Sequence, residues 1–278
     1  MRIDAHQHFW QIARGDYGWL TPALKPIYRD FTLQELGPHL AAAGISGTVL
    51  VQAAPTEAET RFLLRLAAES AGVIGGVVGW IDFEAPDARQ RLEQLAGNPL
   101  LCGIRPMIQD IDDTDWMLDR RLDGAFRAVV DLGLCFDALV QPRHLPALRR
   151  LLDRHPDLRT VVDHGAKPAI AAAAREPWAR ELRSLARETQ AWCKLSGLAT
   201  EARADWAPDD LAPYAAHLLD CFGPARLIWG SDWPVVNLAG GYEKWWTATN
   251  WFLRGLREAE RESVLGGNAA RFYGLQAG

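Results

Sequence analysis

Short apolar runs alternate with amphipathic helical stretches along all 278 residues, and this alternation constrains the fold more than any other feature of the sequence. Eight runs have the continuous apolar character of strands covered on both faces, at 3–8, 48–52, 73–81, 101–105, 134–140, 158–164, 191–196 and 226–232. Helical stretches occur at 33–43, 56–71, 87–95, 119–132, from 142 onward, 178–189, 211–222, 242–253 and 258–273. The pattern predicts an α/β fold, a (β/α)8 TIM barrel, as a single domain over residues 1–278.

His6 and His8 lie one residue apart at the end of the first predicted strand. Alternate side chains of a strand share a face, so the two imidazoles could supply half of a metal site. Alone, the pair is equally typical of ordinary polar residues at a strand end. His164 and Asp232 change that balance, because each ends another apolar run. The carboxyl ends of barrel strands surround one mouth, so we expect one mononuclear site there.

These residue types point to hydrolytic chemistry. Three neutral histidines and a carboxylate can hold Zn²⁺ or a similar ion, which would polarise a carbonyl and acidify bound water. Asp232 is predicted either as a ligand or as the base that takes a proton from the attacking water. Arg105, Lys167 and Lys194 suit a substrate with a carbonyl, a carboxylate or a developing oxyanion, although each is individually typical of a surface residue or an ion pair.

The chain contains 12 tryptophans, and Trp10, Trp116 and Trp233 lie near predicted site residues. They either fill a large core or line a pocket for a polyhydroxylated ligand. The formal charge of −5 argues against nucleic acid or an anionic membrane as a partner. The four cysteines form no CxxC pair, and we recognise no membrane span or signal peptide. We therefore expect a cytoplasmic protein, whose oligomeric state, a homo-oligomer included, stays open.

Seven stretches occur in an order that resembles the amidohydrolase superfamily, in the group that contains lactonases of sugar acids such as L-fuconolactone and L-rhamnonolactone. They are DAHQHFW (4–10), VQAA (51–54), GWID (79–82), GIR (103–105), VDHGAKP (162–168), CKLSGL (193–198) and GSDWP (230–234). The resemblance implies a distorted TIM barrel and attack of water on a lactone carbonyl. It also implies roles for four residues: metal ligands or carbonyl polarisers at His6, His8 and His164, and the general base at Asp232.

One departure from the superfamily concerns the fifth strand. Many members have histidines at the ends of both strands five and six, whereas here the fifth strand ends in Val140-Gln141-Pro142. We therefore expect a single divalent ion, zinc first, held by His6, His8, His164 and Asp232. Whether activity requires the ion stays open, because the related group includes lactonases that work without a metal.

The leading hypothesis is a hydrolase of carbohydrate metabolism that opens a sugar-acid lactone such as L-fuconolactone. Asp232 and His164 are its predicted catalytic residues. The predicted substrate-binding residues are Trp10, Gln52, Arg105, Trp116, Lys194 and Trp233. Three alternatives stand beside it: a hydrolase of a dicarboxylate lactone, a decarboxylase of an aromatic acid from the same superfamily, and a sugar-binding barrel without catalysis.

Overall fold

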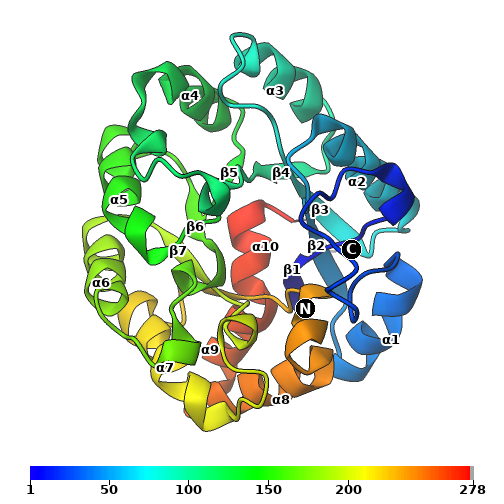
Figure 1. The fold of residues 1–278 in the computed structure, drawn as a ribbon, viewed down its shortest axis with the longest axis vertical. Coiled ribbons are helices and arrows are strands. Elements are labelled where there is room, and N and C mark those ends of the chain that lie inside the picture. Colours follow the sequence, from blue (N-terminus) through cyan, green and yellow to red (C-terminus); the bar gives the residue numbers. More distant parts are fainter. Residues whose placement is uncertain (276–278) are drawn as a thin grey trace.

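The computed structural model describes residues 1–275, in which eight parallel strands form a barrel inside a ring of helices (Figure 1). The strands pair in sequence order. They are β1 (Ile3–Gln7), β2 (Gly47–Val51), β3 (Ile74–Gly79), β4 (Leu101–Ile104), β5 (Cys135–Ala138), β6 (Thr160–Val162), β7 (Trp192–Leu195) and β8 (Leu227–Trp229). The barrel closes beyond β8, where the Asp232 N–H donates to the His6 carbonyl at 2.8 Å. The predicted TIM barrel is confirmed.

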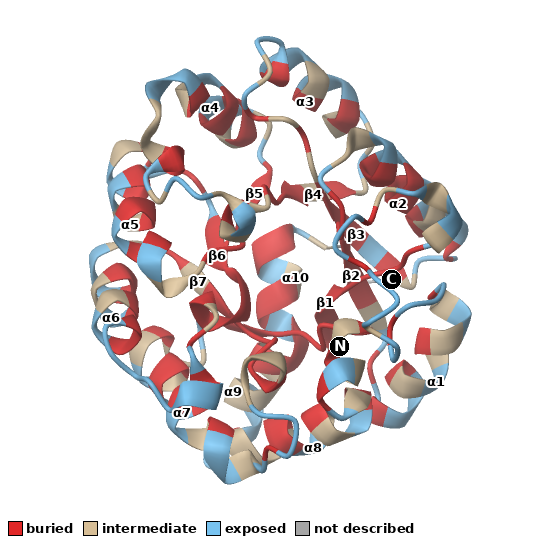
Figure 2. Ribbon diagram, viewed as in Figure 1, coloured by how far each residue is buried: buried red, intermediate tan, exposed pale blue. Residues whose placement is uncertain are grey.

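The α-helices of the described residues lie outside the barrel, apart from α10, and all of these outer helices except α9 bury one side against it (Figure 2). They are α1 (Leu33–Ala43), α2 (Glu57–Glu69), α3 (Ala88–Ala96), α4 (Asp123–Asp131), α5 (Leu145–Arg154), α6 (Trp178–Glu188), α7 (Pro208–Phe222), α8 (Gly241–Phe252), α9 (Glu258–Glu262) and α10 (Asn268–Tyr273). Because helices cover the strands from outside, strand residues are buried on both faces. Within residues 1–275 no helix is both long and apolar enough to cross a membrane.

The predicted and observed elements differ mainly at their ends. The sixth and eighth strands stop at Val162 and Trp229, so His164 and Asp232 lie in the turns that follow them. Both residues have left-handed backbone, with φ of 53° and 59°. The predicted helix 258–273 is divided by a π-helical turn, where Gly266 lies so close to the N-terminus that a Cβ would be 2.3 Å from the Met1 carbonyl oxygen.

Helix α10 closes one end of the barrel, and in Figure 1 it lies within the ring of strands. The Cys135 thiol, at the start of β5, donates to the Phe272 carbonyl at 3.2 Å. Leu275 lies near Gly75 and Gly76, at the start of β3. These contacts are at the amino ends of the strands. The carboxyl ends at the opposite face are therefore left to build a site, as in other barrels of this type.

Candidate active site

Three imidazoles surround one carboxylate at the carboxyl end of the barrel. The Oδ1 atom of Asp232 lies close to the Nε2 atom of each imidazole: 3.3 Å from His8, 3.8 Å from His6 and 3.9 Å from His164. The side chains are buried, and at most 6% of the surface of each is exposed. Residues from the ends of three strands thus meet at one point, as the strand count predicts.

Glycines allow this close approach. A Cβ on Gly197 would lie 2.4 Å from His164 Nδ1, and one on Gly230 would lie 2.5 Å from His6 Cβ. The left-handed backbone of His164 and Asp232 costs energy for residues other than glycine, and such strain concentrates at functional sites. The turns after β6 and β8 therefore give up some backbone stability, and in return the side chains of His164 and Asp232 point at the centre.

The second ring nitrogen of each histidine has its own partner. His8 Nδ1 lies 2.8 Å from the Val51 carbonyl, and His164 Nδ1 lies 2.9 Å from Ser196 Oγ. A carbonyl only accepts hydrogen bonds, so His8 carries a proton on Nδ1. In a neutral His8, the lone pair of Nε2 then faces the Asp232 carboxylate at 3.3 Å. Two acceptors at this distance need a proton or a cation between them.

This donor set fits a divalent ion. Tetrahedral zinc, with bonds of about 2.0–2.2 Å to nitrogen and oxygen, separates its ligand atoms by roughly 3.4 Å. The distances from Asp232 Oδ1 to the three imidazoles, 3.3–3.9 Å, are close to that value. His6, His8 and Asp232 form one group that could hold an ion, and His6, Asp163 and His164 form another. The ring nitrogens that face away are oriented by outer groups, as is usual for metal-ligating histidines.

A buried ion cluster lies directly behind His6. Lys194 Nζ lies 2.5 Å from Asp137 Oδ2, 3.0 Å from Asp163 Oδ1 and 3.0 Å from His6 Nδ1, and Lys194 has no exposed surface. Tyr273 also donates to Asp137 Oδ2, at 2.7 Å. A lysine without exposed surface has no face for a substrate. This corrects the expectation that Lys194 stands in the substrate cavity, and its contacts suit a role in holding Asp163 and His6.

Arg105 is held in a similar way. It donates to Gln52 Oε1 through Nε at 3.2 Å and through Nη2 at 2.8 Å, while Gln52 Nε2 donates to the Arg105 carbonyl at 3.1 Å. Its Nη1 lies 3.3 Å from Asp163 Oδ2 and 3.3 Å from His6 Nε2. Gln52 is fully buried, so its contacts orient Arg105 and leave no surface for a substrate. Nη1 of Arg105 is the part of this pair that points to the reactive centre.

Burial and neighbouring charges set the protonation states. Burial lowers the pKa of His164 to about 4, and burial followed by the charge of Lys194 holds the pKa of His6 well below its usual range. Burial alone would raise the pKa of Asp232, but the facing imidazoles, His164 foremost, bring the pKa below its ordinary value. Near neutral pH His6 and His164 are therefore neutral and Asp232 is ionised, as metal binding requires.

Two of the predicted tryptophans are core residues. Trp10 is fully buried, its indole N–H donates to the Arg29 carbonyl at 2.7 Å, and its ring stacks on His8 with centroids 6.5 Å apart. Trp233 is 2% exposed and packs edge-on against Phe31. The core alternative therefore describes both residues better than direct contact with a sugar. The Trp10 ring supports the His8 imidazole.

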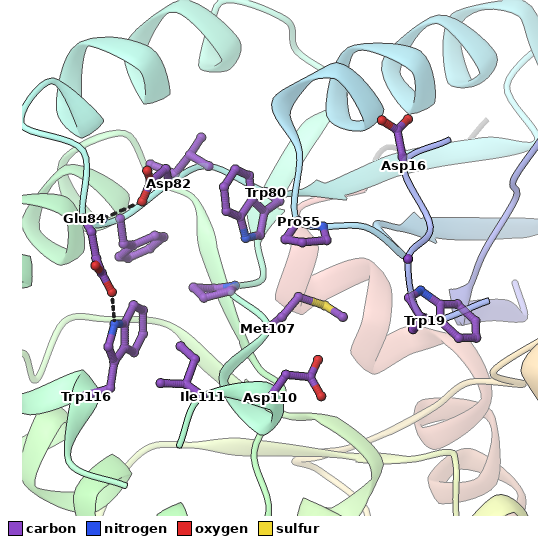
Figure 3. Close-up of a pocket in the computed structure, with 14 residues that line it drawn as sticks. Asp16, Trp19, Pro55, Trp80, Asp82, Glu84, Met107, Asp110, Ile111 and Trp116 are labelled. Atoms are coloured by element: carbon purple, nitrogen blue, oxygen red, sulfur yellow. Dashed lines mark hydrogen bonds between the residues drawn. The ribbon is translucent and has the colours of Figure 1, made fainter. Parts of the chain in front are cut away.

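A cavity of about 520 Å³ opens at the same end of the barrel, among the segments that follow β2, β3 and β4, and the four reactive side chains do not line it (Figure 3). Pro106 and Met107, directly after Arg105, form part of its wall, as does Pro55, shortly after β2. Trp116 also lines it. Of the predicted substrate-binding residues, Trp116 is the one that faces this space.

The amidohydrolase family profile matches residues 3–275. The chain belongs to this family. The amidohydrolase is 47% identical to an L-fucono-1,5-lactonase from Burkholderia ambifaria, over 98% of this chain and 95% of that protein. It is 38% identical to an L-fucono-1,5-lactonase from Burkholderia multivorans, over 99% and 96%. A crystal structure of a Burkholderia multivorans amidohydrolase with bound Zn has a TM-score of 0.93 and 36% identity, covering 99% of this chain and 100% of that one.

Sequence reasoning about the amidohydrolase missed the carboxylates behind the histidines. Asp137 lies inside the apolar run Cys135–Ala138, and a charged residue inside such a run is itself a signal of a buried partner. Asp163 directly precedes His164 and pairs with both Arg105 and Lys194. No local pattern marks Ser196, whose role depends on the loop after β7 lying beside His164.

Proposed function

We propose that this amidohydrolase opens the ring of a sugar-acid 1,5-lactone, with L-fucono-1,5-lactone as the substrate to test first. The predicted lactonase class is confirmed by two full-length relatives of that name. One observation carries the proposal for the residues: Asp232 Oδ1 faces three imidazoles within 3.9 Å, at the mouth of the barrel. In the reaction, water adds to the ring carbonyl, the ring C–O bond breaks, and the product is the open sugar acid.

Asp232 accepts the proton of the attacking water and returns it to the leaving ring oxygen. It is ionised near neutral pH, because the imidazoles keep its pKa low. Nη1 of Arg105 stabilises the oxyanion that forms on the carbonyl, and His164, which stands across from Asp232, would share this role in an enzyme that works without the ion. Gln52 and Lys194 act as positioning residues, the first for Arg105 and the second for Asp163 and His6.

We propose one divalent ion, zinc, as the cofactor, with His6, His8, His164 and Asp232 as the residues that would hold it. When bound, such an ion polarises the lactone carbonyl and lowers the pKa of bound water. The facing lone pairs of His8 and Asp232 support this assignment, as does the zinc-bound relative. Strand β5 carries Asp137 and no histidine, which favours a single ion.

The pairing of the site's cations weighs against a dicarboxylate lactone or an aromatic acid as substrate. Those substrates need cations that are free to receive a carboxylate. Instead Arg105 pairs with Asp163, Lys194 pairs with Asp137 and Asp163, and Lys167 lies 3.3 Å from Glu201. The third alternative, a sugar-binding barrel without catalysis, does not explain why three imidazoles converge on the Asp232 carboxylate.

A pH-indicator assay over a panel of aldonolactones, with and without chelator, tests the proposal. We expect acid release from six-carbon and 6-deoxy sugar 1,5-lactones, and loss of that activity with chelator, restored by zinc. No release from any lactone by folded protein would refute the lactonase proposal. Full activity after chelation, with zinc absent by elemental analysis, would refute the metal requirement alone.

Three further expectations stay predictions: action in the cytoplasm, a role in carbohydrate metabolism, and no nucleic-acid or membrane partner. The oligomeric state, a homo-oligomer included, stays open, and light scattering of the purified protein measures it directly. Growth of a strain that lacks this protein, on the sugar from which the lactone derives, tests the role in carbohydrate metabolism.

A further inference from the structure

The cavity beside the reactive centre has an aromatic wall. Trp19, Trp80 and Trp116 border it from three separate segments of the chain, with Met107 between them (Figure 3), and Phe83 also lines it. Its volume of about 520 Å³ lies in the range of small-molecule sites. It begins directly after Arg105, the residue whose Nη1 points to the reactive centre. A substrate held at that centre therefore has this space on one side.

Two of the three indole N–H groups of this wall are already used. Trp19 Nε1 donates to the Ala53 carbonyl at 2.7 Å, and Trp116 Nε1 donates to Glu84 Oε1 at 2.7 Å. Trp19 and Trp116 can therefore offer a ligand the faces and edges of their rings. Aromatic faces suit the C–H surfaces of a sugar ring or a methyl group, and they give no recognition of an anion.

The charged residues that line the cavity are all acidic: Asp16, Asp82, Glu84 and Asp110. Asp16 is paired with Arg14, while Asp110 and Glu84 are exposed at the rim. Carboxylates accept hydrogen bonds from hydroxyl groups and repel other anions. Arg105, Lys167 and Lys194 do not offset this field, because each is already paired with a carboxylate.

We propose that this cavity is the recognition site for the neutral, hydroxylated part of the lactone, and that it rejects lactones carrying a second anionic group. The inference rests on the proposed lactonase function and specifies its substrate class. The rings hold the C–H face of the substrate, the carboxylates of Asp82 and Asp110 accept from its hydroxyl groups, and the same carboxylates repel a substrate carboxylate or sulfonate.

The expected discrimination follows from Coulomb's law. At about 8 Å and the dielectric constant of water, each uncompensated carboxylate lowers the binding of a substrate anion by roughly twofold, and three together by about tenfold. This repulsion is screened over a Debye length of about 10 Å at 0.1 M salt, so it should weaken as salt is added. Stacking on a tryptophan contributes about two- to tenfold.

The experiment compares two six-carbon 1,5-lactones of the same stereochemistry, one ending in a hydroxymethyl group and one in a carboxylate. We expect wild-type kcat/KM at low salt to favour the neutral lactone about tenfold or more, and the ratio to shrink at 0.5 M salt. The double variant Asp82→Asn/Asp110→Asn should lower the ratio about fivefold. The variant Trp80→Leu should raise KM for the neutral lactone two- to tenfold.

The matched control is Asp112→Asn/Asp113→Asn, which removes two charges from the loop that contains Asp110 but does not touch the cavity lining. It should leave the ratio as in the wild type. Equal kcat/KM for both lactones, or an equal change in the test and control variants, overturns the inference while the lactonase function stands. A folded protein that hydrolyses neither lactone overturns the proposed function itself.

Discussion

Replacement of Asp232 by asparagine is the sharpest test of the reaction, because it removes the charge and keeps the shape. Asparagine tolerates the left-handed backbone at φ 59°, where alanine would be strained. Its carbonyl oxygen can occupy the position of Oδ1, 3.3 Å from His8 Nε2. The lost function is proton acceptance from water. Positioned general bases contribute about 10²–10⁴ in rate, or about 3–5 kcal/mol of activation free energy.

The assay measures kcat on L-fucono-1,5-lactone, together with zinc content and melting temperature, for wild type and Asp232→Asn. We expect kcat to fall at least about 100-fold with little change in melting temperature, since the substitution leaves no buried charge behind. Asp153→Asn, an exposed position on α5, should retain wild-type kcat. A variant with full zinc content and kcat within about tenfold of wild type would refute the role of Asp232 as base.

Three substitutions test the surroundings. Gly197→Ala should abolish most activity, because the added Cβ would lie 2.4 Å from His164 Nδ1; kcat and zinc content measure the displacement. Lys194→Met should lower the free energy of unfolding in urea by about 3–5 kcal/mol, since two buried carboxylates lose their cation. Glu59 on α2 is buried and accepts from the N–H groups of Ala53 and Ala54, directly after β2. Burial raises the pKa of Glu59 to about 7, so the native state binds more protons than the unfolded state between pH 4.5 and 7. Wild-type stability relative to Glu59→Gln should therefore fall by about 3 kcal/mol as the pH rises through that window, and a flat difference would contradict this reasoning.

The convergence of His6, His8, His164 and Asp232 could be predicted because it depends on strand counting alone. In a parallel barrel every strand delivers its end to the same mouth, so a polar residue after an apolar run is placed without knowledge of its side-chain contacts. The prediction did not depend on the exact ends of the strands. Strand β8 stops three residues before Asp232, and the turn that follows still points the Asp232 carboxylate at the histidines.

The depth of a side chain within the barrel could not be predicted in this way. Lys194 is inside β7 and Arg105 directly follows β4, and strand counting gives both the same place at the mouth. Whether they reach a substrate depends on partners from other strands. Asp137 in β5 pairs with Lys194, and Asp163 after β6 pairs with both Lys194 and Arg105. These pairs join residues that are far apart in the sequence, so no single stretch predicts them.

The inward pairing of Arg105 and Lys194 has a consequence for specificity. Behind and within the centre, these two cations pair with Asp137 and Asp163, and Asp232 faces the imidazoles. Before an ion binds, the three carboxylates outnumber the two cations, and this net negative charge favours a divalent ion. The cations that assemble the centre are thereby unavailable to select a substrate. Selection then depends on the neighbouring cavity, whose aromatic wall and acidic rim favour neutral hydroxylated lactones. In this arrangement, changes to the rim can alter substrate preference without disturbing the residues that activate water.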